Sequence, residues 1–308
     1  MAGFERILCA VDKSECSVRA LQYAVALQQS HRAALSVLTV RPRVAPPALW
    51  TEYPVAPELA PMDPETEEAE LRAFIQSSVG ASLARVIVRE GVIVPEIIAA
   101  AHVLDIDLLV MGTHGPGAVE RWLLGSVAEN VLRHASCPVL TVPSHAGEPP
   151  DAPAKPFKTI LCAIDFSRDS QRALTVAHGL AQAAAGRLVV VHALEHLSGE
   201  TPALAAHFNV ADFRRTLEGV ARQRLGELLV SEVDNQCETR VVVANGKASR
   251  EVLRVAATTE ADLIVLGVHG RNAIDLALFG STTRHVLHRA TVPVLTVPRD
   301  LTVAATAA

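Results

Sequence analysis

The sequence predicts an α/β fold in which two five-stranded, doubly wound parallel-sheet domains follow one another along the chain. Three observations predict it. The 308 residues suffice for about two domains of ordinary size, and half of them are hydrophobic although only 4% are aromatic. Short aliphatic runs alternate with amphipathic segments, which is typical of buried parallel strands and their covering helices. The whole pattern of runs then occurs a second time.

The repeat is visible at both ends of each half. Residues 6–12 recur as residues 159–165, and residues 112–143 align without gaps with residues 267–298. The longer pair of segments is identical at 16 of its 32 positions. Since repetition at this level indicates duplicated structure, we expect the same domain twice, each copy able to fold alone.

Proline positions locate the joints of the chain. Seven of the 18 prolines lie in residues 42–64 and five lie in residues 143–156. Proline removes a backbone donor and breaks a regular helix. The first cluster therefore predicts a Pro-rich insertion that runs into an acidic helix start at residues 63–65, and the second predicts a linker. The predicted divisions are domain 1 at 1–145, linker at 146–156, domain 2 at 157–300 and a C-terminal tail at 301–308.

The elements are expected in the same order in both halves. In the first half the aliphatic runs predict strands at 5–11, 34–40, 84–89, 107–111 and 138–142. In the second half they predict strands at 158–164, 187–193, 239–244, 262–266 and 293–297. Helices fill the intervals, for example 15–29 and 168–184, and we expect Ser14 and Ser167 to be their N-caps. Right-handed crossovers favour the strand order 3-2-1-4-5.

The strand order also predicts where a ligand binds. Open α/β sheets bind ligands beyond the carboxyl ends of the strands, at the point where the strand order reverses. Here that point lies between the first and fourth strands. These strands end at Asp12 and Gly112 in the first half, and at Asp165 and Gly267 in the second. We therefore expect these four residues to line a crevice in each half.

A glycine motif with the spacing G-x-x-G-x9-G-S follows the fourth strand of each half. Its members are Gly112, Gly115, Gly125 and Ser126, and then Gly267, Gly270, Gly280 and Ser281. Glycine lets backbone N–H groups approach an anion closely. The Gly-Ser pair is expected to open a helix whose N–H groups favour phosphate, with the serine hydroxyl as both N-cap and phosphate donor. The duplicated motif predicts two phosphate-binding sites.

Together these features resemble the universal stress protein family in its tandem-domain, ATP-binding form. The resemblance rests on the Val-Asp or Ile-Asp end of the first strand, the glycine motif and the closing C-P-V-L-T-V-P strand. It covers both halves apart from the insertion and the linker. It implies the adenine nucleotide α-hydrolase-like fold and bound ATP or ADP, with or without Mg²⁺. It also implies that Asp12 and Asp165 contact the adenosine end, and that Val40 and Ala193 contact adenine through their backbone.

The two halves differ after the second glycine of the motif. The second half has Arg271 and Asn272 there, and a guanidinium at this point could pair with phosphate. The first half has Pro116 and Gly117 instead, with Arg121 later in the loop as a candidate substitute. Charge thus favours stronger nucleotide binding at the second site. The insertion, acting as a lid at the adenine edge, would instead favour stronger binding at the first.

Several of these residues have an ordinary structural alternative. Asp12 and Asp165 could cap the following helices, and the Gly-Ser pairs could be plain helix starts. His114 and His269 are candidate acid–base groups, but local packing or hydrogen bonding is the preferred interpretation because spacing fixes no partner carboxylate. No histidine pattern has metal-ligand spacing, so no dedicated metal site is predicted.

Three functions fit these features. The preferred hypothesis is a stress-response regulatory protein whose ATP or ADP occupancy is coupled to the binding of a protein partner or to assembly. The alternatives are a slow ATPase or phosphoryl-transfer enzyme, and a structural dimerisation module with empty sites. Catalysis ranks below binding because the Walker lysine pattern G-x-x-x-x-G-K-[ST] is absent from the sequence. No catalytic residue is assigned.

Partners and location follow from the remaining features. The net charge of −5 argues against nucleic-acid binding. Single-domain members of the family pair through their last strands as homodimers, so the resemblance implies an internal pairing of residues 139–142 with residues 294–297, and further homo-oligomers. The five cysteines are odd in number and include no C-x-x-C pair, so neither a disulfide framework nor a zinc ribbon is predicted. This cysteine usage fits a reducing compartment. With no signal peptide and no apolar stretch of membrane-spanning length, the sequence predicts a cytoplasmic protein.

Overall fold

Strands and helices alternate in the same order in the two halves. The structure, a computed structural model, describes residues 3–42, 63–80, 85–114, 124–147, 157–195, 210–232, 237–269 and 280–299. The first half contains β1 (Arg6–Ala10), α1 (Glu15–His31), β2 (Ala34–Pro42), α2 (Pro64–Val79), β3 (Arg85–Gly91), α3 (Ile93–Val103), β4 (Leu108–Gly112), α4 (Ser126–His134) and β5 (Val139–Val142). The second contains β6 (Thr159–Ala163), α5 (Arg168–Ala184), β7 (Arg187–Leu194), α7 (Val210–Glu232), β8 (Glu238–Asn245), α8 (Ala248–Thr258), β9 (Leu263–Gly267), α9 (Ser281–Arg289) and β10 (Val294–Val297). Every predicted strand is present, with ends within two residues of the expectation.

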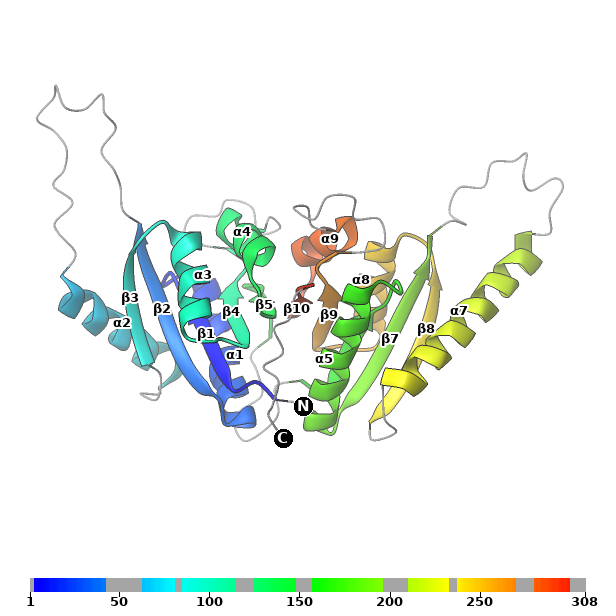
Figure 1. The fold of residues 1–308 in the computed structure, drawn as a ribbon, viewed down its shortest axis with the longest axis horizontal. Coiled ribbons are helices and arrows are strands. Elements are labelled where there is room, and N and C mark those ends of the chain that lie inside the picture. Colours follow the sequence, from blue (N-terminus) through cyan, green and yellow to red (C-terminus); the bar gives the residue numbers. More distant parts are fainter. Residues whose placement is uncertain are drawn as a thin grey trace, which may run out of the picture.

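These strands form one continuous sheet in the order β3-β2-β1-β4-β5-β10-β9-β6-β7-β8 (Figure 1). The neighbours within each half are parallel. The predicted α/β class and the order 3-2-1-4-5 are therefore confirmed in both halves.

Short polar residues set the starts of α1, α2 and α5. Ser14 and Ser167 are the N-caps of α1 and α5, and each side chain accepts a hydrogen bond at 3.2 Å from the backbone N–H three residues on. Both predicted N-caps are confirmed. Asp63 caps α2, whose first residue is Pro64. Proline suits this position because its ring has a helical φ and its missing N–H has no intrahelical partner to lose.

The two halves meet through their last strands, as the resemblance implied. β5 and β10 are antiparallel, with Leu140 opposite Leu295. The hydroxyl of Thr141 donates to the Val294 carbonyl at 3.2 Å, and the buried Thr296 adds a second hydroxyl bond across the same junction. The pairing turns two five-stranded sheets into one and buries an edge of each.

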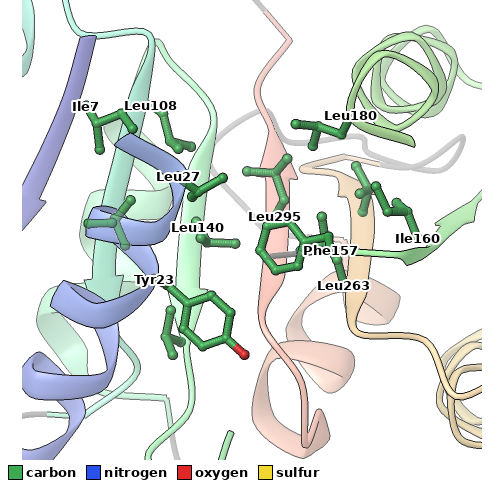
Figure 2. Close-up of a cluster of buried hydrophobic side chains, with 14 of the residues drawn as sticks. Ile7, Tyr23, Leu27, Leu108, Leu140, Phe157, Ile160, Leu180, Leu263 and Leu295 are labelled. Carbon is green, nitrogen blue, oxygen red and sulfur yellow. The ribbon is translucent and has the colours of Figure 1, made fainter. Parts of the chain in front are cut away.

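Each face of the sheet carries a hydrophobic core that continues across this junction. One core lies under α1, α2, α5 and α7, and the other under α3, α4, α8 and α9. Figure 2 shows the first core where the halves meet, with Leu140 and Leu295 side by side. Tyr23 of α1 stacks on Phe157, which precedes β6, with ring centroids 5.8 Å apart. The halves therefore share packing as well as strand pairing.

Some predicted features lie outside the described residues. These include most of the Pro-rich insertion, most of the linker, and the tail. Among the residues that are described, no helix combines the length and the apolar character needed to cross a membrane.

Candidate functional site

The strand order reverses at equivalent places in the two halves. β1 lies between β2 and β4, and β6 lies between β7 and β9. The carboxyl ends of β1 and β4 lead to Asp12 and Gly112, and those of β6 and β9 lead to Asp165 and Gly267. The sheet thus brings each predicted aspartate and first motif glycine to neighbouring strand ends, where open α/β sheets bind ligands.

The first glycine of each motif allows a helix to approach the strand end. A Cβ atom on Gly112 would lie 2.6 Å from the Cβ of Cys16, in the first turn of α1. A Cβ atom on Gly267 would lie 2.8 Å from the carbonyl carbon of Asp169, in the first turn of α5. Both distances are shorter than real Cβ contacts. These glycines therefore have a packing role that the phosphate interpretation did not include.

A backbone hydrogen bond joins the two ends of each glycine loop. The N–H of Gly125 donates to the Thr113 carbonyl at 2.8 Å, and that of Gly280 donates to the Val268 carbonyl at 3.2 Å. Each bond holds the N-terminus of α4 or α9 against the end of β4 or β9. The first N–H groups of a helix have no partner within it, so they are available to an anion at this edge.

The serines of the motif are not the N-caps of these helices, and that prediction is wrong. Gly125 and Gly280 are the N-caps, while Ser126 and Ser281 are the first residues inside α4 and α9. The reason is that each glycine has a non-helical ψ but already accepts the first helical hydrogen bond, at 2.9 Å from the N–H of Glu129 in the first half. Both serines are exposed residues.

The rest of the motif lies outside the described residues. This applies to Gly115 and Gly270, and to the differing loop residues Pro116, Gly117, Arg121, Arg271 and Asn272. Their roles at the phosphate end stay predictions.

Asp12 closes the turn that joins β1 to α1. Its Oδ1 accepts hydrogen bonds from the N–H of Ser14 at 3.1 Å and from the hydroxyl of Ser17 at 2.5 Å. In the second half, Oδ1 of Asp165 accepts from the N–H of Ser167 at 3.0 Å. The helix-start interpretation of both aspartates thus has contacts to support it. Among the described residues, Oδ2 of the exposed Asp12 has no hydrogen-bond partner, so this carboxylate has acceptor capacity left for a ligand.

Val40 and Ala193 lie beside these aspartates. The strand register pairs Ala10 with Leu38, so two residues further on Val40 is level with Asp12. The equivalent register in β6 and β7 places Ala193 level with the aspartate of the second half. Both residues are half-buried. The three described parts of each predicted site, the aspartate, the end of the second strand and the helix N-terminus, therefore share one edge of the sheet.

The turn after each aspartate is held by different chemistry in the two halves. Lys13 and Phe166 occupy equivalent positions and have left-handed φ values of 61° and 65°, which few residues with a side chain adopt. Nζ of Lys13 forms an ion pair with Glu70 of α2 at 2.6 Å. In contrast, the ring of Phe166 lies 4.2 Å beneath the guanidinium of Arg224 of α7.

The loop histidines also have different partners. Nδ1 of His114 lies 2.9 Å from the hydroxyl of Thr113, in agreement with local hydrogen bonding. Nδ1 of His269 lies 3.3 Å from Oδ2 of Asp169 in α5. The spacing of residues in the sequence did not indicate this carboxylate neighbour of His269. The only sequence signal for Asp169 was its place in the first turn of a predicted helix, where the first half has Cys16.

His114 lies at the junction of the halves. Burial lowers its pKa below the ordinary value of 6.5, and the nearby His288 and His145 lower it further. Nδ1 of His288, on α9 of the second half, accepts a hydrogen bond at 3.2 Å from the N–H of Leu124 in the first. The base of the first glycine loop is thus linked to a helix of the other half.

We expect His114 to reduce stability in mild acid. Because its pKa is lowered in the folded state, the unfolded chain binds more protons below about pH 6.5, and this part of the stability is lost as the pH falls. In His114→Asn the thermal unfolding midpoint should fall less between about pH 7.5 and about pH 5 than in the wild-type protein. His102→Asn, at an exposed position of α3, is the control. An unchanged pH dependence in His114→Asn would contradict the prediction.

Metal binding gains no support from the side chains that the structure describes. Among them, no group of three histidine, cysteine, aspartate or glutamate residues is placed to hold a metal ion.

Comparison with known proteins gives the family. The model of the universal stress protein family matches residues 3–143 and residues 156–298. The chain belongs to the universal stress protein family. The universal stress protein Rv1996 of Mycobacterium tuberculosis is 31% identical over 315 aligned positions, which cover 96% of each protein. The crystal structure of a universal stress protein from Archaeoglobus fulgidus shares the fold, with a TM-score of 0.61 at 23% identity, and covers 96% of this chain and 98% of that one.

Similarity is locally higher in another relative. The universal stress protein Rv2005c of Mycobacterium tuberculosis is 34% identical over 195 residues, which make up 62% of this chain and 61% of that protein. This chain thus spans less than two thirds of the length of that relative. As a universal stress protein with two matching segments, the chain is a tandem-domain member of the family, in agreement with the repeat.

Proposed function

We propose that this universal stress protein binds an adenine nucleotide, ATP or ADP, at the carboxyl end of each half-sheet, and that occupancy regulates partner binding or assembly. The hydrogen bond that closes each glycine loop carries the proposal. It holds a helix N-terminus against the end of β4 or β9, next to the strand that leads to Asp12 or Asp165. Oriented N–H groups and a helix dipole suit phosphate, and an aspartate acceptor suits ribose hydroxyls.

The net charge of the chain is consistent with phosphate binding by a few local groups. A net charge of −5 gives no general attraction for a polyphosphate. Phosphate binding would therefore depend on local groups, which here are the N-termini of α4 and α9 with Ser126 and Ser281, and the predicted Arg271. ATP and ADP are both candidate ligands, so the experiment compares them.

Calorimetric titration of the full chain tests the proposal. We expect binding of ADP and ATP, and we expect Asp12→Asn and Asp165→Asn each to weaken one site about tenfold or more, because each loses a charged acceptor. Asparagine keeps the Oδ1 acceptor of the turn, so the helix starts should persist. Asp105→Asn is the matched control, since Asp105 is exposed, distant from the carboxyl strand ends and in a left-handed conformation that asparagine tolerates.

The other two hypotheses give different results in this experiment. No affinity for ATP, ADP or AMP, together with no nucleotide in the purified protein by mass spectrometry, would contradict the proposal and favour the structural module. Release of phosphate from bound ATP, lost in the two aspartate variants, would favour the slow ATPase. Equal weakening by the control would show that the aspartates are not contact residues.

A further inference from the structure

In the first half a hydroxyl group orients the loop histidine. Thr113 is buried at the end of β4, and its Oγ1 lies 2.9 Å from Nδ1 of His114. The adjacent first turn of α1 supplies Cys16, whose thiol is only a weak hydrogen-bonding group. The threonine is therefore the polar partner of this ring nitrogen.

In the second half both neighbouring residues are exchanged. Val268 stands where the first half has the threonine, and it has no hydroxyl. Asp169 stands where the first half has the cysteine, and its Oδ2 lies 3.3 Å from Nδ1 of His269. One polar partner of Nδ1 is lost and another is gained from a different element. The exchange keeps a partner on the same ring nitrogen.

The environment of Asp169 requires an explanation of its own. The residue is 4% exposed, and its Oδ2 makes no regular hydrogen bond to another described residue, so its contact with Nδ1 of His269 at 3.3 Å is an ion-pair contact. A buried carboxylate is unfavourable unless a cation or donor compensates it. An acidic residue in a first helical turn needs no burial to interact with the dipole, and Ser167 already caps α5. The helix start therefore does not explain why this carboxylate is buried beside an imidazole.

We propose that Asp169 is a positioning residue that fixes the ring of His269, as Thr113 fixes that of His114. A carboxylate that accepts a proton-bearing nitrogen selects the tautomer of His269 with the proton on Nδ1, and in the first half the Thr113 hydroxyl holds the same ring nitrogen of His114. Nε2 of His269 is thereby held in one state at the base of the second glycine loop. The inference that Nε2 then meets the nucleotide rests on the proposed function, but the fixing of the ring does not.

Nuclear magnetic resonance of histidine labelled with nitrogen-15 tests the fixing of the ring. In the wild-type protein we expect His269, assigned by comparison with His269→Gln, to show the separate ring-nitrogen shifts of one tautomer with the proton on Nδ1. Asp169→Cys should give the averaged shifts of an exchanging ring. Adding Val268→Thr to that variant copies the first half and should restore a fixed ring. Unchanged shifts in Asp169→Cys would overturn the proposal.

Nucleotide titration of the same variants separates positioning from stability. Asp169→Cys should weaken the second site about threefold to tenfold, as expected for one lost polar contact, and the double variant should recover the affinity. Asp212→Asn, an exposed carboxylate on α7, is the control for loss of charge. Loss of affinity without recovery would mean that Asp169 has only a structural role, which overturns the proposal.

Two further results can be told apart. If the wild-type protein binds no nucleotide, the proposed function fails, while the ring-nitrogen shifts still decide the role of Asp169. If Asp169→Cys does not fold, Thr113→Val provides the equivalent test in the first half. In Thr113→Val the ring nitrogens of His114 should show the averaged shifts of an exchanging ring. Adding Cys16→Asp to the same chain should restore the shifts of a fixed ring. Failure of that restoration would overturn the proposal.

Discussion

Replacing Leu295 by alanine is expected to lower the free energy of unfolding of the whole chain by about 2–5 kcal/mol. The side chain is 1% exposed and lies in β10, opposite the equally buried Leu140 of β5. The core under α1 and α5 continues across this pair, as Figure 2 shows. A cavity at this point is lined by both halves, so neither half can relax into it without disturbing the other.

Calorimetric unfolding measures this effect. Because the core is shared, we expect a single transition for the wild-type protein and a single, shifted transition for Leu295→Ala. Val103→Ala, at a position of α3 that is 69% exposed, should change the free energy of unfolding by less than about 0.5 kcal/mol. Two separate transitions in the wild-type protein, of which Leu295→Ala shifts only one, would show that the halves unfold independently.

Gly267→Ala is expected to cost about 1–3 kcal/mol in the free energy of unfolding, and Gly112→Ala a similar amount. The added methyl group would lie 2.8 Å from the Asp169 carbonyl carbon in one case and 2.6 Å from the Cys16 Cβ in the other. In both cases the helix has to move away from the strand end. Much of the contact is with backbone, which a side-chain rotation cannot relieve.

Gly219→Ala is the matched control. Gly219 lies in α7, and apart from the adjoining helix backbone no atom of the described residues lies within 4 Å of its added Cβ. Because alanine stabilises a helix interior relative to glycine, this variant should gain about 0.5–1 kcal/mol. Chemical denaturation would compare the three variants. If Gly267→Ala keeps the wild-type stability and loses only nucleotide affinity, the glycine is there for phosphate and the packing argument is wrong.

Much of the fold was predictable because it depends on local patterns. Aliphatic runs with amphipathic intervals predicted each strand, and the repeat showed that one sheet order had to serve both halves. The junction of β5 with β10 was implied by the family resemblance, since nothing in their aliphatic sequences specifies which strand lies opposite. Ser14 and Ser167 were predictable as caps because a cap is a contact over three residues.

The site was less predictable because it depends on long-range contacts. Asp169 and His269 are far apart in the sequence, and they meet only because Gly267 lets α5 approach β9. Motif spacing could not predict this pair. The motif spacing also predicted the N-cap of α4 at Ser126, whereas the structure has it at Gly125. Only the backbone conformation distinguishes an N-cap from the first helical residue, and the sequence does not give that conformation.

The covalent connection between the halves has a consequence for how their sites can differ. Two separate identical chains dissociate on dilution and must carry the same residues on both sides. A tethered pair keeps its β5–β10 seam at any protein concentration, because the partner is always present at a high effective concentration. Each half is then free to accumulate its own substitutions, as Thr113 with Cys16 and Val268 with Asp169 illustrate. Under the proposed function, one molecule would thereby carry two unlike nucleotide sites at a fixed ratio of one to one.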